Sequence, residues 1–150
     1  MNIDIIYESK YGNGKKAMMY LETILRKKGH SVQLMSVHDI KPQSLPEADL
    51  YIFSAPNAFG KIVRSMRKFL DKIEIKNQSA HYILVNTCLN PASSQDKGLE
   101  QMEEILRKKN ISKLSEGLKL KVIAIKGPLE SGYEKKLDEL AQTIQSSLKK

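Results

Sequence analysis

The chain has 150 residues, of which 41% are hydrophobic and 28% are charged. This composition excludes a disordered chain and is sufficient for one domain with a substantial core. No stretch approaches the ~18 apolar residues of a membrane span, and the start, MNIDIIYESK, lacks the pattern of a secretion signal. Cys88 is the only cysteine and cannot form an internal disulfide. We therefore expect residues 1–150 to form a single domain in the reducing cytoplasm.

The formal net charge is +8 and the pI is about 9.5. Such a charge is typical of partners of nucleic acid or of anionic membranes, but it also arises from a hydrated, lysine-rich surface. Clusters at residues 26–28 and 107–109 end predicted helices, where cations interact favourably with the helix dipole. We favour the hydrated surface over nucleic acid. The three histidines His30, His38 and His81 lack ligand spacing, so we expect no metal.

Five short apolar segments alternate with four amphipathic ones, at the spacing of repeated strand–helix units. The expected strands are Ile3–Tyr7, Ser31–Val37, Leu50–Ala55, Tyr82–Cys88 and Leu118–Ile125. The expected helices run from about Asn13 to Lys28, and from about Lys61, Gln95 and Gly132, the last with Leu148 on its apolar face. Pro42 and Pro46 predict a loop between the second and third strands.

The residue pattern within the strands predicts their order. The first, third and fourth strands are nearly continuous apolar runs, as expected where helices cover both faces. The fifth begins Leu-Lys-Leu-Lys-Val, and the second contains Gln33 and Ser36, so both suit the edges of a sheet. We expect an α/β fold, a doubly wound three-layer sandwich with a five-stranded parallel sheet of order 2-1-3-4-5.

In such a sheet, ligands bind beyond the carboxyl ends of the strands, beside the first and third. The loop Glu8–Gly14, ESKYGNG, follows the first strand. Its glycines permit a tight turn into a helix, Ser9 offers a hydroxyl, and lysines stand on both sides. These are the parts of a phosphate site, although a plain turn between strand and helix would also use glycines.

Two further loops reach the same place. In SAPNAFGK, Phe59 either lies at the mouth of the crevice or packs on Phe69 beneath the loop. The loop NTCLNPASSQ is rich in small polar residues that suit the edge of a heterocycle or a simple connection. We expect its Cys88 to be a small buried residue rather than a reactive thiol.

Together these segments resemble the flavodoxin family over essentially the whole chain. IIYESKYGNGKKA is similar to the family's phosphate loop, [ST]-x-[TY]-G-N-T followed by a helix. YIFSAPNAFGKIVRSMRKFLDKI is similar to the segment in which the third strand ends in G-[ST]-P-T-Y-x-G before a helix ending in F-L-D. The chain has no long insertion in its fifth strand, which resembles the short-chain flavodoxins.

The resemblance implies a site for flavin mononucleotide (FMN), with no catalytic side chain and no metal. The residues that it places around the phosphate are Ser9, Lys10, Tyr11, Gly12, Asn13 and Gly14. Those that it places along the ribityl chain and the flavin ring are Pro56, Asn57, Ala58, Phe59 and Gly60. Those that it places at the other edge of the ring are Thr87, Cys88, Leu89 and Asn90.

Three departures from the family bear on this site. Gly14 stands where the phosphate loop ends in threonine, which removes one hydroxyl donor and predicts weaker binding of FMN. The chain has no tryptophan, and its third loop has no aromatic residue, so we expect the flavin to be stacked on one face only. Finally, electron-carrying flavodoxins are typically acidic, whereas this chain is basic.

The resemblance implies an FMN-binding redox protein that transfers electrons to partner proteins or anionic small molecules, and we favour a carrier over a stand-alone oxidoreductase. Two alternatives stay open. One is an enzyme resembling menaquinone-dependent protoporphyrinogen oxidase, because VNTCLNP is similar to its fourth-strand region and the basic surface suits peripheral contact with an anionic membrane. The other is a binding module without flavin. A signalling receiver domain is excluded, because the third strand ends in Ser54-Ala55 and not in acidic residues.

The cations near the predicted site form a separate pattern. Carboxylates are sparse in the same segments, where Glu8 stands alone. The pattern predicts a positive rim that attracts an anionic partner. The residues of this rim are Lys10, Lys15, Lys16, Lys61 and Arg64, and Lys97 is a further candidate beside them.

Overall fold

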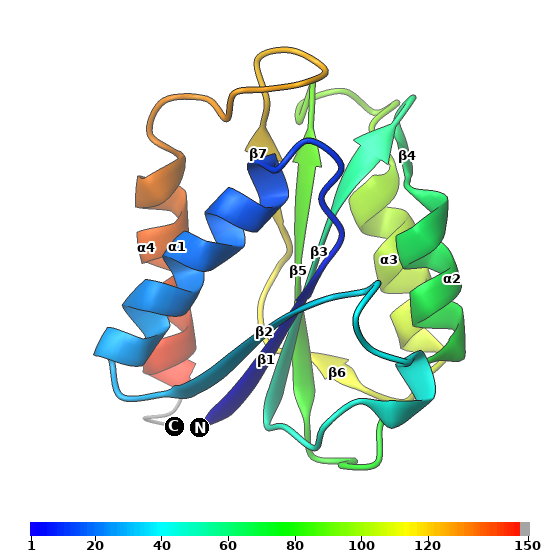
Figure 1. Ribbon diagram of the computed structural model, residues 1–150, viewed down its shortest axis with the longest axis vertical. Coiled ribbons are helices and arrows are strands. Elements are labelled where there is room, and N and C mark those ends of the chain that lie inside the picture. Colours follow the sequence, from blue (N-terminus) through cyan, green and yellow to red (C-terminus); the bar gives the residue numbers. More distant parts are fainter. Residues whose placement is uncertain (148–150) are drawn as a thin grey trace.

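The computed structural model describes residues 1–147, which form a sheet between two layers of helices (Figure 1). The strands are β1 (Asn2–Tyr7), β2 (Ser31–Ser36), β3 (Leu50–Ala58), β4 (Lys61–Ile62), β5 (His81–Cys88), β6 (Ser112–Lys113) and β7 (Leu118–Lys121). The helices are α1 (Asn13–Lys27), α2 (Arg64–Lys72), α3 (Gly98–Arg107) and α4 (Tyr133–Ser147), with a 3₁₀ turn η1 (Pro42–Ser44). Leu148, expected on the last helix, lies outside the described residues.

The order of the parallel strands is β2-β1-β3-β5, which confirms the predicted order for the first four positions. Two short strands share the outer side of β5. Strand β6 pairs with its beginning at His81 and Tyr82, and β7 pairs with its end from Val85 to Cys88. The fifth position of the predicted sheet is therefore divided between β6 and β7.

Two hydrophobic clusters fill the space between the sheet and the helices. Helices α1 and α4 cover one face and α2 and α3 the other (Figure 1). Because successive side chains of a strand point to opposite faces, Ile5 packs in the α1–α4 cluster and Ile6 in the α2–α3 cluster. Both are fully buried, as the apolar run of the first strand predicts.

The helix expected from about Lys61 begins instead at Arg64. Lys61 and Ile62 pair antiparallel with Ala58 and Asn57, which makes a β3–β4 hairpin. Its two turn residues, Phe59 and Gly60, have φ values of 54° and 79°, as in the type I′ turns that join tight hairpins. The apolar period that marked the helix extends backwards through Ile62, so it concealed the hairpin.

The strand expected over Leu118–Ile125 ends at Lys121. The chain then turns back on itself, because the amide of Ile123 donates to the carbonyl of Pro128, at 2.9 Å. As a result Ile123 and Ile125 stand exposed at the carboxyl edge of the sheet. The helix expected from about Gln95 begins at Gly98, after a turn closed by the Asp96 amide and the Ser93 carbonyl.

Asp4 is a buried carboxyl in the central strand β1, with only 4% of its surface exposed. Its Oδ2 atom has no hydrogen-bond partner within residues 1–147. Burial raises the pKa of this carboxyl from 3.8 to about 6. The folded protein thus retains a proton that the unfolded chain has already released, so stability declines as the pH rises through this interval.

We expect Asp4→Val to raise the free energy of unfolding at neutral pH by about 1–3 kcal/mol, because it removes the cost of a buried, unpaired carboxylate. Urea unfolding from acidic to neutral pH should show a smaller decline for the variant than for wild type. The exposed Asp39→Asn serves as control and should reproduce the wild-type decline. Parallel curves for Asp4→Val and wild type would contradict this account.

Candidate functional site

A cleft of about 310 Å³ opens at the carboxyl edge of the sheet. All three predicted loops contribute to its lining. Their contributing residues are Ser9, Lys10, Tyr11, Asn13, Gly14, Pro56, Asn57, Ala58, Phe59, Gly60, Thr87, Cys88 and Leu89. Gly12 and Asn90 are neighbours of these residues in the chain but do not line the cleft. The loops meet because β1, β3 and β5 are adjacent and parallel.

Four residues that line the cleft were not predicted: Val63, Asp96, Val122 and Ile125. Val63 was assigned to the start of a helix, and Val122 and Ile125 to a strand. For Val122 and Ile125 the sequence did offer a signal, because the segment after the fifth strand also reaches the carboxyl edge of the sheet. Asp96 was passed over because it follows a polar loop at some distance from the strand.

The loop between β1 and α1 presents unpaired hydrogen-bond donors to the cleft. Gly12 caps α1 with φ 89°, a left-handed conformation that favours glycine. Ser9 Oγ accepts a hydrogen bond from the Lys15 amide at 3.1 Å, which leaves the hydroxyl proton of Ser9 free to donate. Within residues 1–147, none of the backbone amides of residues 10–14 donates a hydrogen bond. This loop therefore offers several donors to one acceptor-rich group.

The electrostatic environment of this loop favours an anion. Lys15 and Lys16 stand in the first turn of α1, which has no acidic residue, and helix N-termini repel cations. The carboxylate of Glu8 is engaged on the other side, where its Oε2 accepts from Ser65 Oγ at 2.5 Å and lies 2.6 Å from His38 Nε2. An anion held by the loop amides would offset the repulsion between the lysines and the helix.

A chain of buried polar groups joins the hairpin to β5 and to the loop before α3. Asn86 Nδ2 donates to the Ala55 carbonyl at 2.9 Å and to Asn57 Oδ1 at 2.7 Å. Asn57 Nδ2 donates to Asp96 Oδ1 at 3.3 Å, and the Asn90 amide donates to Asp96 Oδ2 at 3.0 Å. These contacts fix the walls of the cleft. The only sequence signal for Asn86 was one polar residue within an apolar strand.

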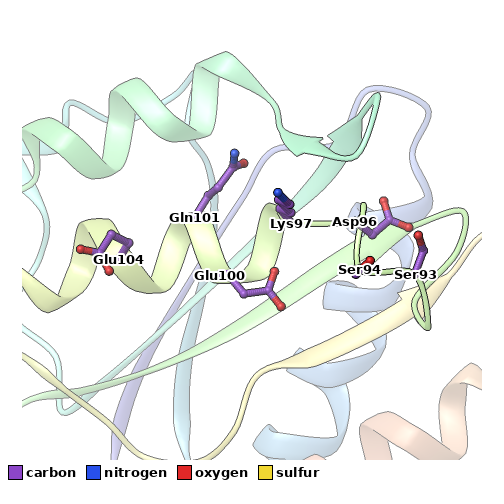
Figure 2. A pocket seen from close by; sticks show the side chains of 7 residues that line it. All are labelled: Ser93, Ser94, Asp96, Lys97, Glu100, Gln101 and Glu104. Carbon is purple, nitrogen blue, oxygen red and sulfur yellow. The ribbon is translucent and has the colours of Figure 1, made fainter.

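The far side of this network borders a second groove, of about 470 Å³, that runs along the start of α3 (Figure 2). Lys97 lies beside the hairpin, and its amide donates to the Gly60 carbonyl at 2.6 Å. Gln101 Oε1 accepts from the Ile62 amide at 2.8 Å. The polar groups of this groove therefore anchor the hairpin to α3. Ser94, Glu100 and Glu104, which also line this groove, are exposed.

Apolar side chains stand exposed around the mouth of the cleft. Phe59, at the tip of the hairpin, is fully exposed and does not pack on Phe69, which resolves the alternative left open by the sequence. Its φ of 54° is unfavourable for a bulky side chain. Such strain is characteristic of residues whose position serves binding. Leu89 and Ile125 are exposed on other loops of the same cleft.

Cys88 lies at the floor of the cleft and is buried, as expected. Burial, reinforced by the nearby charge of Asp96, raises the pKa of its thiol to about 11. The thiol is therefore protonated at neutral pH and is a poor nucleophile. Across residues 1–147, no three His, Cys, Asp or Glu side chains gather as metal ligands would.

Comparison with known proteins identifies the family. A family model described as a flavodoxin domain matches residues 4–122. The chain belongs to the flavodoxin family. No curated protein sequence matches the chain. None of the helices in the described part of this flavodoxin-family chain is long and apolar enough to cross a membrane.

Solved flavodoxins share the fold at low sequence identity. The flavodoxin of Streptococcus pneumoniae TIGR4 is 17% identical, with 97% of this chain and 99% of that chain covered and a TM-score of 0.77. Flavodoxin 2 of Bacillus cereus is 18% identical, with 97% and 99% covered and a TM-score of 0.80. Rubredoxin oxygen:oxidoreductase of Desulfovibrio gigas is 18% identical, with 99% of this chain but 36% of that chain covered and a TM-score of 0.80.

The two glycines of the first loop should respond in opposite ways to alanine. Gly14 has ordinary helical geometry, and a Cβ there would lie 3.6 Å from Ser9 Oγ and 3.7 Å from Ser54 Oγ, in normal contact. We expect Gly14→Ala to raise the free energy of unfolding by about 0.5–1 kcal/mol. Gly12→Ala should lower it by about 1–2 kcal/mol, because φ is 89° there. Urea unfolding of both variants tests this, and a loss of stability in Gly14→Ala would show that the helix start requires glycine.

Proposed function

We propose that the cleft binds FMN and that the protein carries electrons between redox partners. The observation that supports this most directly is the set of unpaired amides at residues 10–14. They stand at the positive end of α1 and border an apolar cleft, in a chain of the flavodoxin family. When bound, FMN supplies the capacity to accept and release electrons.

The phosphate end of the site would be formed by the loop between β1 and α1. The amides of residues 10–14 and the hydroxyl of Ser9 would donate hydrogen bonds, and the lysines of this loop would offset the charge of the phosphate. Gly14 stands where the family pattern has threonine. The loop is not collapsed at this position, because no atom lies closer than 3.6 Å to the place that a Cβ would occupy. We therefore propose that the missing threonine weakens binding without abolishing it.

The ring end of the site would lie between the hairpin and the loops after β5 and β7. Phe59 offers an aromatic face, and Leu89 and Ile125 offer apolar contact on other sides. Thr87 and Asn57 supply polar atoms at the floor, while the Cys88 thiol stays protonated and so leaves the flavin bound without a covalent link. A cleft of this size, mainly apolar with a few directed polar groups, is typical of cofactor sites.

The polar groups in the cleft favour an electron carrier over an enzyme with its own acid or base. Asp96 is the only carboxyl that lines the cleft among the described residues, and it accepts hydrogen bonds from Asn57 and from the Asn90 amide. These contacts give it the role of holding two loops together. Since no histidine of the described chain lines the cleft either, the side chains would hold the cofactor and leave the chemistry to it.

The phosphate contacts predict selectivity among flavins. Each hydrogen bond to a charged acceptor contributes ~1.5–3 kcal/mol, so FMN should bind at least about tenfold more tightly than riboflavin. Fluorescence titration of the apoprotein with FMN, FAD and riboflavin measures this. Ser9→Ala should weaken FMN binding and leave riboflavin unchanged, whereas Ser94→Ala, on the neighbouring groove, should affect neither. Equal affinities for FMN and riboflavin would refute the phosphate site.

Phe59 provides a separate test of the ring site. Aromatic contact contributes ~0.5–1.5 kcal/mol beyond the buried area, so Phe59→Ala should weaken FMN binding about two- to tenfold or more. Phe59→Gly should do the same while stabilising the apoprotein, because glycine tolerates φ 54°. Met19→Ala, an exposed apolar residue of α1 away from the cleft, is the control and should bind FMN as wild type does. Unchanged affinity in both Phe59 variants would remove this residue from the site.

A further inference from the structure

Most of the net positive charge of the protein lies in the segments that line the cleft. The four segments that line the cleft are residues 8–16, 54–65, 88–98 and 119–132, which we term the cleft segments. They contain nine Lys and Arg residues against three carboxylates, a net +6 of the total +8. The remainder of the chain is close to electrically neutral. If the lysines served only to hydrate the surface, we would expect the net charge to be spread more evenly over the chain.

In the cleft segments the carboxylates are engaged in hydrogen bonds or an ion pair, whereas most of the cations are exposed. Glu8 and Asp96 are buried and engaged by hydrogen bonds, and Glu130 pairs with Lys136 at 3.0 Å. Of the nine cations, Lys119 is half-buried and lies 3.6 Å from Glu100. The other eight are exposed, and none of them pairs with a carboxylate within residues 1–147. The accessible charge around the cleft is therefore almost wholly positive.

The cleft segments also carry most of the exposed large apolar residues of the described chain. Five of the six exposed large apolar residues of the described chain lie in the cleft segments. They are Tyr11, Phe59, Leu89, Ile123 and Ile125. All but Ile123 line the cleft itself, so they border the place proposed for the flavin. An apolar centre within a charged rim is the usual anatomy of a protein–protein contact.

We propose that this end of the molecule docks an acidic redox protein, which would meet the cofactor edge through the apolar centre and be oriented by the cationic rim. The proposal rests on the function proposed above and specifies the chemistry of its partner. An acidic protein is favoured over an anionic membrane because exposed apolar side chains at the mouth of the cleft lie among exposed cations, which is the anatomy of a protein–protein contact. The charge would act mainly on the rate of association, and salt would screen it over ~8 Å at physiological ionic strength.

One redox protein in two charge states provides a matched pair of probes. Native cytochrome c is basic, and cytochrome c with succinylated lysines is acidic. The flavin-loaded protein is first reduced chemically. Stopped-flow absorbance at low salt should then show that it reduces succinylated cytochrome c at least about tenfold faster than native cytochrome c. Added salt should slow this reaction and accelerate that of the native form. Equal rates, or rates that ignore salt, would overturn the proposal.

Two charge-reversed variants then locate the effect. Lys61→Glu with Lys97→Glu changes the hairpin and the adjacent start of α3. Lys72→Glu with Lys108→Glu makes the same change of charge at the other ends of α2 and α3, away from the cleft. The first pair should slow the reaction with the succinylated probe several-fold, and the second should leave it close to wild type. Equal effects of both pairs would mean that total charge, and not this surface, determines the rate.

A measurement that needs no flavin separates this proposal from the function on which it rests. Reduced succinylated cytochrome c should shift the amide NMR signals of the cleft segments in ¹⁵N-labelled protein, whether or not FMN is bound. Shifts without electron transfer would support the docking surface while refuting the carrier function. Shifts confined to other surfaces would overturn the docking surface. Sedimentation with phosphatidylglycerol vesicles, in a protein that gives no shift with the acidic probe, would assign the surface to a membrane instead.

Discussion

The parallel pairing of β1, β3 and β5 is the constraint on which the site depends. Three strands that run in the same direction deliver their following segments to one edge, although these segments are up to about eighty positions apart in the sequence. The buried side-chain amide of Asn86 in β5 then secures the geometry, since it donates to the Ala55 carbonyl and to the Asn57 side chain at the end of β3. Without this pairing, the donors of the first loop and the apolar groups of the others would share no cleft.

Sequence patterns predicted the structural elements correctly where one physical cause determined the local structure. Continuous apolar strands and the period of the helices predicted the layers and the order of the first four strands, and the glycines of the first loop predicted the turn into α1. The pattern failed where two causes overlapped. Ile62 continues the apolar period of the helix, yet the backbone freedom of Gly60 places it in a hairpin. Ile123 and Ile125 continue the apolar pattern of the strand, although the chain has already turned there. Asp96 and Asn86 act through hydrogen bonds between distant segments, which no local pattern displays.

The proposed site combines a fold shared with solved flavodoxins and a concentration of cations in the segments that line the cleft. The cationic loops around the cleft oppose the positive end of α1 and so cost stability in the absence of an anion. The left-handed backbone of Phe59 adds a second local cost. Both costs lie within the segments that border the cleft and are absent from the clusters that pack the helices on the sheet. The hydrophobic clusters therefore stabilise the fold, whereas the segments that border the cleft lower its stability and form the proposed site.

The division of the outer side of β5 between β6 and β7 has a consequence for assembly. An uninterrupted edge strand offers a continuous row of unpaired amides and carbonyls that another chain can extend. Here the outermost strands have two and four residues, with Lys113, Lys119 and Lys121 among them. A second molecule that approached this side would find an interrupted ladder and could form only a few backbone hydrogen bonds with it. The interruption therefore disfavours edge-to-edge pairing on this side of the sheet.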